Sequence, residues 1–283
     1  MYADLHLHST VSDGTNTPEE VVKKAKEMGF AAIALTDHDT VDGLEQALDA
    51  GRKLGIEVIP GIEISTLQGE EELHVLGYFI NWRDETLIKK LKLFVESRKT
   101  RAEKMVRKLN ELGIKISLER VKQIAGPDFI GRPHIAKALI EKGYVKSIPE
   151  AFTERFIGKN GKAYVERYKV NVEEGIKMIL DAGGIPVLAH PGLMHWDYGR
   201  VSEETIIKYK GMGLKGIEVF YSKHDKNTTK RFFDIAQRND LLITGGSDCH
   251  GDNGEGRLMG AVKLPYMYVE KLKQAKAKLI SGF

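Results

Sequence analysis

The chain has very little cysteine and no long hydrophobic run. Its single cysteine, Cys249, excludes an internal disulfide bond and is typical of a protein in a reducing compartment. Residues 1–30 lack a basic segment followed by an apolar one, so we expect no signal peptide. No apolar run approaches the ~20 residues that a membrane span needs. We therefore expect a cytoplasmic protein that does not contact a membrane.

The net charge is also small. The formal value of +3 does not by itself indicate nucleic-acid binding, although local positive charge could still bind an anionic substrate. Repeats, low-complexity tracts and linkers are absent from the sequence. With 283 residues, of which 42% are hydrophobic, the chain can bury a large core as one α/β barrel or as two smaller domains.

Short apolar stretches alternate with amphipathic ones along most of the chain. The first predicted helix has Thr17 as its N-cap, Pro18 at its first position and Gly29 after its end. A repeated strand–helix alternation predicts a parallel, barrel-like sheet. The predicted strands are 2–6, 31–35, 57–60, 73–79, 185–188, 216–220 and 241–244. The predicted helices are 18–28, 41–54, 172–182, 203–210, 226–238 and 268–280.

This alternation stops between residues 82 and 170. Residues 84–112 have helical periodicity and a charged face rich in lysine and arginine, and shorter helices are predicted at 117–124, 133–141 and 148–155. We interpret residues 82–170 as a helical insertion into a barrel formed by residues 1–81 and 171–283. Such an insertion either acts as a lid that reads the substrate or only stabilises the fold.

Histidine and acidic residues gather at the ends of the predicted strands. They occur in Asp4-Leu5-His6-Leu7-His8, Asp13, Asp37-His38-Asp39, Glu63, His74, His190 and Asp248-Cys249-His250. Alternate residues of a strand share a face, and the strand ends of a barrel converge on one mouth. The number of imidazole and carboxylate groups exceeds the four ligands of one tetrahedral ion, so we predict two or three divalent transition-metal ions.

Individual residues of these clusters can have different roles. Asp13 lies in a Ser-Asp-Gly sequence that is typical of a turn. Glu63, between two isoleucines, is our candidate for a carboxylate that bridges two metals. Either Asp37 or Asp39 would accept a hydrogen bond that fixes the tautomer of His38. Taken together, the clusters indicate a metallohydrolase.

The motifs resemble those of the PHP (polymerase and histidinol phosphatase) family. The resemblance rests on D-x-H-x-H-S at residues 4–9, S-D-G at 12–14, T-D-H-D at 36–39, G-x-E-x-S at 61–65, His74, A-H-P at 189–191 and G-S-D-x-H at 246–250. It covers nearly the whole chain. It implies a distorted seven-stranded (β/α) barrel with a two- or three-metal centre of manganese, zinc or iron. The most similar members are small, stand-alone hydrolases of nucleotides and short RNA.

The resemblance also implies which residues bind each metal. The implied ligands are His6, His8, Glu63 and Asp248 for one ion; Glu63, His74 and His190 for a second; and Asp13, His38 and His250 for a third. Some relatives have histidine at the position of Asp13, and an oxygen ligand there favours Mn or Fe over Zn.

Two further segments resemble phosphate-binding parts of these phosphoesterases. In Gly131-Arg132-Pro133-His134, the planar guanidinium of Arg132 would hold a phosphate and His134 would be a further donor. The alternative is an ion pair at the start of a helix. His224 would contact the scissile phosphate or protonate the leaving oxygen, unless it is only a surface loop residue. His195 has no counterpart, and we expect it in a loop.

The sequence therefore predicts a metal-dependent phosphoesterase in which an activated water attacks phosphorus in line, with Glu63, Asp248 and His224 as catalytic residues. We expect a small phosphorylated substrate, either a nucleoside 3′,5′-bisphosphate or the 5′ end of a short RNA, and no obligate protein partner. A histidinol-phosphate phosphatase is the alternative enzyme. A non-catalytic metal-binding regulatory or polymerase-accessory module is the alternative of another class, which the complete ligand set and the lack of a polymerase domain disfavour.

Overall fold

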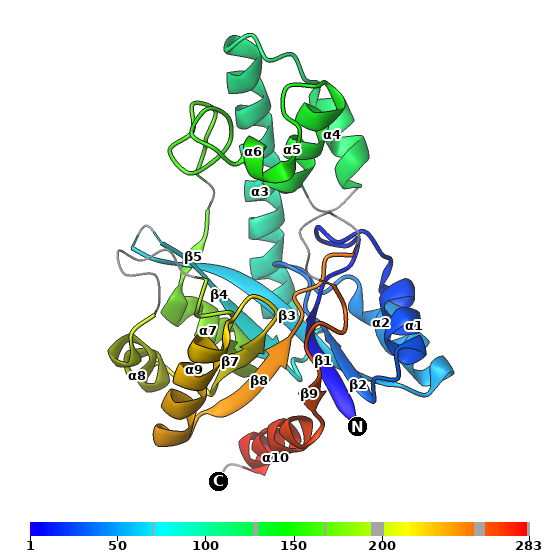
Figure 1. Cartoon of the computed structure of the whole chain (residues 1–283), viewed down its shortest axis with the longest axis vertical. Helices are drawn as coiled ribbons and strands as arrows, with labels where there is room; N and C mark the ends of the chain where they lie inside the picture. Colours follow the sequence, from blue (N-terminus) through cyan, green and yellow to red (C-terminus); the bar gives the residue numbers. More distant parts are fainter. Residues whose placement is uncertain (70, 127–129, 167, 194–200, 252–257, 282–283) are drawn as a thin grey trace. The chain divides into compact units, whose positions relative to one another are not determined.

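The computed structural model describes residues 1–69, 71–126, 130–166, 168–193, 201–251 and 258–281 (Figure 1). The chain divides into two compact units. Unit 1 comprises Met1–Thr10, Gly14–Ile88 and Lys169–Phe283, and unit 2 comprises Val11–Asp13 and Lys89–Tyr168. Each unit has a hydrophobic core of its own.

Unit 1 is built around one curved sheet. In the described ranges its strands of four or more residues are β1 (Tyr2–Leu7), β2 (Ala32–Leu35), β3 (Glu57–Gln68), β4 (Glu71–Tyr78), β6 (Ile185–Leu188), β7 (Gly216–Tyr221) and β8 (Leu242–Gly246). Two shorter strands, β5 (Val170–Asn171) and β9 (Leu264–Pro265), also belong to the sheet. The strand order is β8-β7-β6-β4-β3-β2-β1-β9, and β5 pairs with β3. A parallel bridge between Leu7 and Cys249 brings β1 beside the segment after β8, so the sheet forms a nearly closed barrel. The predicted barrel-like α/β sheet is confirmed, but among the described residues it contains nine strands in place of the seven expected.

The direction of β4 differs from the expected parallel arrangement. It runs antiparallel to both β3 and β6. The reason is that β3 continues to Gln68 instead of ending at residue 60, and only a short turn that includes Gly69, with φ of 59°, precedes β4. A crossover helix does not fit in such a turn, so the two strands form a hairpin. Glu63 therefore lies inside β3, on the same face of the hairpin as His74, whose partner in the ladder is Ser65.

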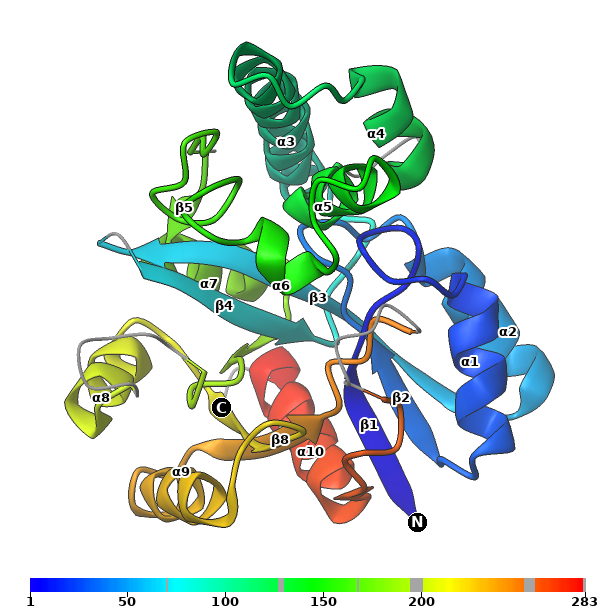
Figure 2. The same ribbon diagram turned by 45° about the horizontal axis from the view of Figure 1, so that its top comes forward.

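Helices pack against this sheet (Figures 1 and 2). Those of unit 1 are α1 (Pro18–Glu27), α2 (Leu44–Leu54), α7 (Val172–Asp181), α8 (Glu203–Gly211), α9 (Lys226–Arg238) and α10 (Met267–Ser281). The start of α1 is as predicted, because the Thr17 hydroxyl accepts from the Glu20 amide at 3.2 Å and the Glu20 carboxylate accepts from the Thr17 amide at 2.8 Å. In α7, Gly175 allows close approach to β3, since a Cβ there would lie 2.5 Å from Thr66 Cγ2.

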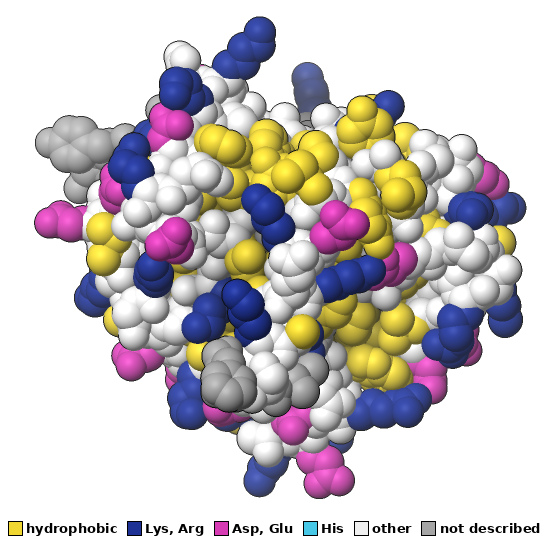
Figure 3. All heavy atoms as spheres, turned by 90° about the horizontal axis from the view of Figure 1, so that it is seen from below, with side chains coloured by type: hydrophobic (Ala, Val, Ile, Leu, Met, Phe, Trp, Pro, Cys, Tyr) yellow, Lys and Arg dark blue, Asp and Glu magenta, His cyan; other side chains and the backbone are white. Residues whose placement is uncertain are grey.

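Strands of the sheet and α10 together form the hydrophobic core of unit 1. Its fully buried side chains include Leu5, Ile59, Leu76, Val187 and Leu272. Figure 3 shows the face on the side of α10 and the N-terminus, where apolar, basic and acidic side chains are mixed and no histidine of the described chain is visible. The histidines of the predicted centre instead lie near or after the carboxyl ends of their strands, except His74, which lies in the first half of the antiparallel β4.

Unit 2 is helical. It contains most of α3 (Glu85–Glu111), together with α4 (Leu118–Ala125), α5 (Arg132–Glu141) and α6 (Ile148–Ala151). These helices bury a core that includes Met105, Leu109, Val121, Ile135 and Leu139. The helix predicted at 148–155 is shorter than expected and ends at Ala151. Phe152 leaves the helical conformation, and the Thr153 hydroxyl donates to the Glu150 carbonyl. No helix in the described part of the chain is long and apolar enough to cross a membrane.

Candidate metal centre

The predicted ligands reach the centre from different strands of the barrel. His6 is on β1 and His8 directly follows that strand. Asp248 and His190 each lie two residues after the end of their strand, β8 and β6 respectively. His38, in the segment after β2, forms an isolated parallel bridge with Glu63 on β3. The closure of the sheet therefore brings residues from both ends of the chain together.

Four fully buried side chains form the tightest group of possible ligand atoms. His6 Nε2 lies 3.2 Å from Glu63 Oε2 and 3.4 Å from Asp248 Oδ1. His8 Nε2 lies 3.3 Å and 3.1 Å from the same two oxygens. Around a tetrahedral ion with bonds of about 2.0–2.1 Å, ligand atoms lie roughly 3.3–3.4 Å apart. The spacing of these four groups therefore fits a common ion.

The hydrogen bonding of this group leads to the same conclusion. His6 Nε2, His8 Nε2 and Glu63 Oε2 are buried and have no hydrogen-bond partner among the described residues. Leaving a polar atom buried and unsatisfied costs about 1–3 kcal/mol. A cation bound between these atoms would satisfy all three at once.

A second set of donors surrounds the other oxygen of Glu63. Oε1 lies 2.8 Å from His74 Nδ1 and 3.0 Å from His190 Nε2. On the first side, Oε2 also lies 3.0 Å from His38 Nδ1. Because its two oxygens face different histidines, the Glu63 carboxylate has the arrangement that a ligand shared by two ions needs.

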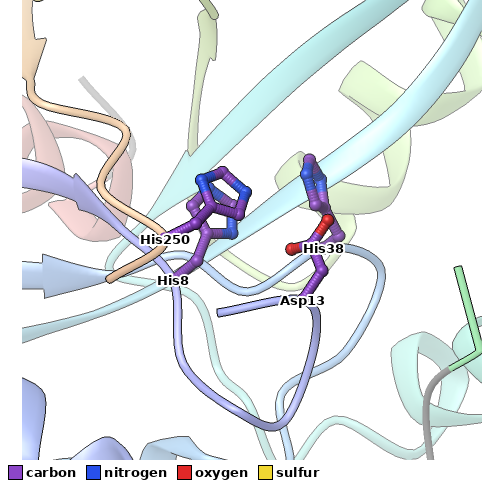
Figure 4. Close-up of side chains that lie close together, drawn as sticks. All are labelled: His8, Asp13, His38 and His250. Atoms are coloured by element: carbon purple, nitrogen blue, oxygen red, sulfur yellow. The ribbon is translucent and has the colours of Figure 1, made fainter. Parts of the chain in front are cut away.

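A third group consists of His8, Asp13, His38 and His250 (Figure 4). Their ligand atoms lie within 4.8 Å of one another. The rings of His8 and His250 are stacked with centroids 4.0 Å apart, and Figure 4 shows the Asp13 carboxylate beside the ring of His38. The structure thus brings together every side chain that was predicted to bind metal. Which ion each side chain binds stays a prediction.

The pKa values of these side chains reflect the crowding of charged groups. Burial alone would lower the pKa of His6, but Glu218, Glu63 and Asp248 raise it well above its ordinary value. Burial likewise opposes protonation of His74, yet Glu63 and Glu72 raise its pKa to about 10. Burial would raise the pKa of Glu63, but the surrounding imidazoles hold it well below its ordinary value. Because an ion binds the deprotonated form of an imidazole, its binding would have to displace protons from His6 and His74.

Three residues of the centre have strained backbones. Asp39, His190 and Asp248 have φ values of 54°, 26° and 54°. Such conformations cost of order 1–3 kcal/mol each in a residue other than glycine. Hydrogen bonds hold them in place: Asp39 accepts from the Ser65 amide at 2.7 Å, and the Asp248 amide donates to the His6 carbonyl at 2.9 Å. Asp37, which was a candidate partner for His38, accepts from the Ser9 amide and hydroxyl at 2.7 Å each.

Two supporting residues were not predicted from the sequence. The Tyr221 hydroxyl donates to Asp248 Oδ2 at 2.8 Å, so Oδ1 of the same carboxylate faces His6 and His8. Glu218 is fully buried on β7 and contacts both His6 and His190. The available signal for Glu218 was an acidic residue within an apolar strand, the same signal that identified Glu63.

Arg132 and His134, the predicted phosphate ligands, belong to unit 2. The guanidinium carbon of Arg132 lies 4.9 Å from the centre of the Phe152 ring and 5.7 Å from that of Tyr164. His134 Nδ1 accepts from the Gly131 amide at 3.1 Å. Burial lowers the pKa of His134 to about 4, so the ring is neutral near pH 7. With Nδ1 as an acceptor, the proton of the neutral ring is on Nε2, which is the donor form expected of a phosphate ligand.

His224 is held by the main chain. Its Nδ1 lies 3.0 Å from the Val219 carbonyl, and its Nε2 accepts from the Gly192 amide at 3.1 Å. These contacts indicate a neutral ring with its proton on Nδ1. Proton donation to a leaving group from Nε2 would require these contacts to change, and the role of His224 as the acid stays a prediction. His195 lies outside the described residues.

Comparison with known proteins agrees with the motifs. A family model described as PHP domain matches residues 4–181. A 3′,5′-nucleoside bisphosphate phosphatase of Chromobacterium violaceum is 34% identical over 91% of this chain and 90% of that protein. A 5′-3′ exoribonuclease of Haemophilus influenzae is 32% identical over 87% of this chain and 89% of that protein. A solved structure of a candidate metal-dependent phosphoesterase from Bifidobacterium adolescentis superposes with a TM-score of 0.88, at 30% identity, over 95% of this chain and 94% of that one. The predicted resemblance is confirmed, and the chain belongs to the PHP domain family.

Proposed function

We propose that this protein is a metal-dependent phosphoesterase that hydrolyses phosphate esters of nucleotides. The substrate class would be a nucleoside 3′,5′-bisphosphate or the 5′ end of a short RNA. The observation that carries the proposal is the convergence of buried, unsatisfied imidazole and carboxylate atoms of His6, His8 and Glu63 with Asp248. The names of the two curated relatives, a bisphosphate phosphatase and an exoribonuclease, support a nucleotide substrate.

The side chains of the centre would hold two to three divalent ions. When bound, such ions lower the pKa of coordinated water and neutralise charge that develops on the phosphate. Glu63 would be shared between ions, while Tyr221 fixes Asp248 so that one oxygen faces His6 and His8. The mixture of nitrogen and oxygen donors suits manganese, zinc or iron.

Arg132 and His134 would bind a phosphate of the substrate. Contacts with the rings of Phe152 and Tyr164 restrict the guanidinium, so less side-chain entropy is lost when it binds a phosphate through two parallel hydrogen bonds. His134, neutral and protonated on Nε2, would donate one more hydrogen bond. Two donors outside the metal ligands favour a substrate with a phosphate in addition to the one that is hydrolysed.

The charge distribution of the chain supports a substrate with several phosphates. Residues 89–168 contain 20 lysines and arginines against nine acidic residues, a formal charge of +11. Because the whole chain carries +3, the remaining residues carry −8. A strongly positive unit raises the local concentration of polyanions and speeds their binding at low salt.

A screen of phosphate release would test the proposal. The protein would be reconstituted with Mn²⁺, Zn²⁺ or Fe²⁺ and given a nucleoside 3′,5′-bisphosphate, a 5′-phosphorylated short RNA, histidinol phosphate and an aryl phosphate. We expect metal-dependent turnover with the highest kcat/KM on a nucleotide substrate. Preference for histidinol phosphate would support the alternative enzyme, and bound metal without any turnover would support a regulatory module.

A further inference from the structure

Glu218 contacts ligands on both sides of the shared carboxylate. It lies on β7 and is fully buried. Its Oε1 is 2.9 Å from His6 Nδ1. Its Oε2 accepts a hydrogen bond from the His190 amide at 2.8 Å. Each oxygen of this carboxylate thus has a different partner, and each partner is a predicted ligand.

We infer that Glu218 is a positioning residue that sets the tautomer of His6 and the backbone of His190. The inference rests on the proposed metal centre and not on the identity of the substrate. His6 Nε2 is the atom that faces Glu63 and Asp248. A neutral imidazole can bind an ion through Nε2 only when its proton is on Nδ1. Glu218 accepts from Nδ1 and therefore selects the tautomer that can bind.

The second contact of Glu218 acts on the backbone. His190 has φ of 26°, a conformation that residues other than glycine rarely adopt. The hydrogen bond from the His190 amide to Glu218 holds the backbone in this conformation. The Nε2 atom of His190 then lies 3.0 Å from Glu63 Oε1. The rings of His6 and His190 are also stacked, with centroids 5.7 Å apart. One buried carboxylate therefore positions a ligand on each side of Glu63.

This role requires a carboxylate and not an amide. Both groups that face Glu218 are donors, and glutamine has only one oxygen to accept from them. The main-chain amide of His190 cannot change, whereas His6 can move its proton. In Glu218→Gln the side-chain NH₂ would face His6 Nδ1, and the proton of His6 would move to Nε2. The atom directed at Glu63 and Asp248 would then be blocked.

The test compares Glu218→Gln with Asp4→Asn. Asp4 is also fully buried near His6, but its hydrogen bonds are with Ser247 and the His6 main chain, so the control removes a buried carboxylate without changing a ring contact. Metal affinity would be measured by titration with Co²⁺, followed by the visible absorption of the bound ion. The position of the ring proton would be read from ¹H–¹⁵N correlation spectra of ¹⁵N-histidine-labelled protein with Zn²⁺.

We expect the unaltered protein to show His6 protonated on Nδ1 with Zn²⁺ bound. Glu218→Gln should bind Co²⁺ about 10–100-fold more weakly and show the proton of His6 on Nε2, whereas Asp4→Asn should retain the original values. Unchanged affinity and an unchanged tautomer in Glu218→Gln would overturn the inference. If Glu218→Gln does not fold, the unaltered protein still tests the inference. A His6 proton on Nε2 in the unaltered protein with Zn²⁺ would also overturn it. Both readouts report metal binding, so a failure to hydrolyse phosphoesters would contradict only the proposed function.

Discussion

Replacing Glu63 with glutamine should remove metal from more than one position. The substitution keeps the size of the side chain but removes a buried negative charge that faces His6, His8, His38, His74 and His190. Removing one partner from a fully buried charged contact typically costs 3–5 kcal/mol. Since 1.4 kcal/mol corresponds to a factor of ten, metal affinity should fall by roughly 10²–10³-fold or more. A shared carboxylate also reduces repulsion between neighbouring cations, so the loss should affect at least two ions.

Elemental analysis after dialysis against metal-free buffer would measure this effect, with phosphate release assayed in parallel. Glu57→Gln is a matched control on the same strand, because Glu57 pairs with Lys273 and Tyr266 and contacts none of the predicted ligands in the described structure. The control should retain its metal and its turnover. Near-normal metal content and turnover in Glu63→Gln would refute the assignment of Glu63 as a shared ligand.

Two further predictions concern the substrate and the pH. Arg132→Ala should leave the metal content intact and lower kcat/KM for a nucleoside 3′,5′-bisphosphate. The expected loss of transition-state stabilisation is about 2–4 kcal/mol, and the loss on an aryl phosphate should be much smaller. Lysine should rescue only part of the loss, and equal losses on both substrates would place Arg132 at the reacting phosphate or in folding. The pKa of His74 is raised from its ordinary 6.5 to about 10, so its contribution to the stability of the metal-free protein is complete below about 6.5 and is lost as the pH rises through about 10. Metal affinity should rise over the same pH range, because metal binding releases the proton of His74. Calorimetry in buffers of different ionisation enthalpy would measure this release, and finding none would contradict the prediction.

The sequence was sufficient to predict the barrel and the convergence of its histidine and acidic side chains, because both depend on local patterns. A strand ends where an apolar run ends, and a histidine at that point lies at the mouth of the barrel whatever the neighbouring strands are. The direction of β4 could not be predicted in the same way. Nothing in the residues before 60 shows that β3 continues through Glu63 to form a hairpin, because that extension depends on pairing with β4.

The contacts that support the ligands were also beyond prediction. Glu218 acquires its role from the neighbours of β7 in the sheet and from the closure that places β1 close to it. Asp37 accepts hydrogen bonds from the amide and the hydroxyl of Ser9, and this contact joins the segments after β1 and β2. Such contacts join segments that are distant in sequence, and their residue types have no distinctive spacing.

Metal stoichiometry tests the central claim most directly. The protein would be purified without chelator, reconstituted separately with Mn²⁺, Zn²⁺ and Fe²⁺, and analysed for bound metal per chain. The three groups of ligand atoms around Glu63 and His38 predict two to three ions per chain. One ion or none after reconstitution would contradict a multinuclear centre, and with it the proposal that Glu63 joins two metals.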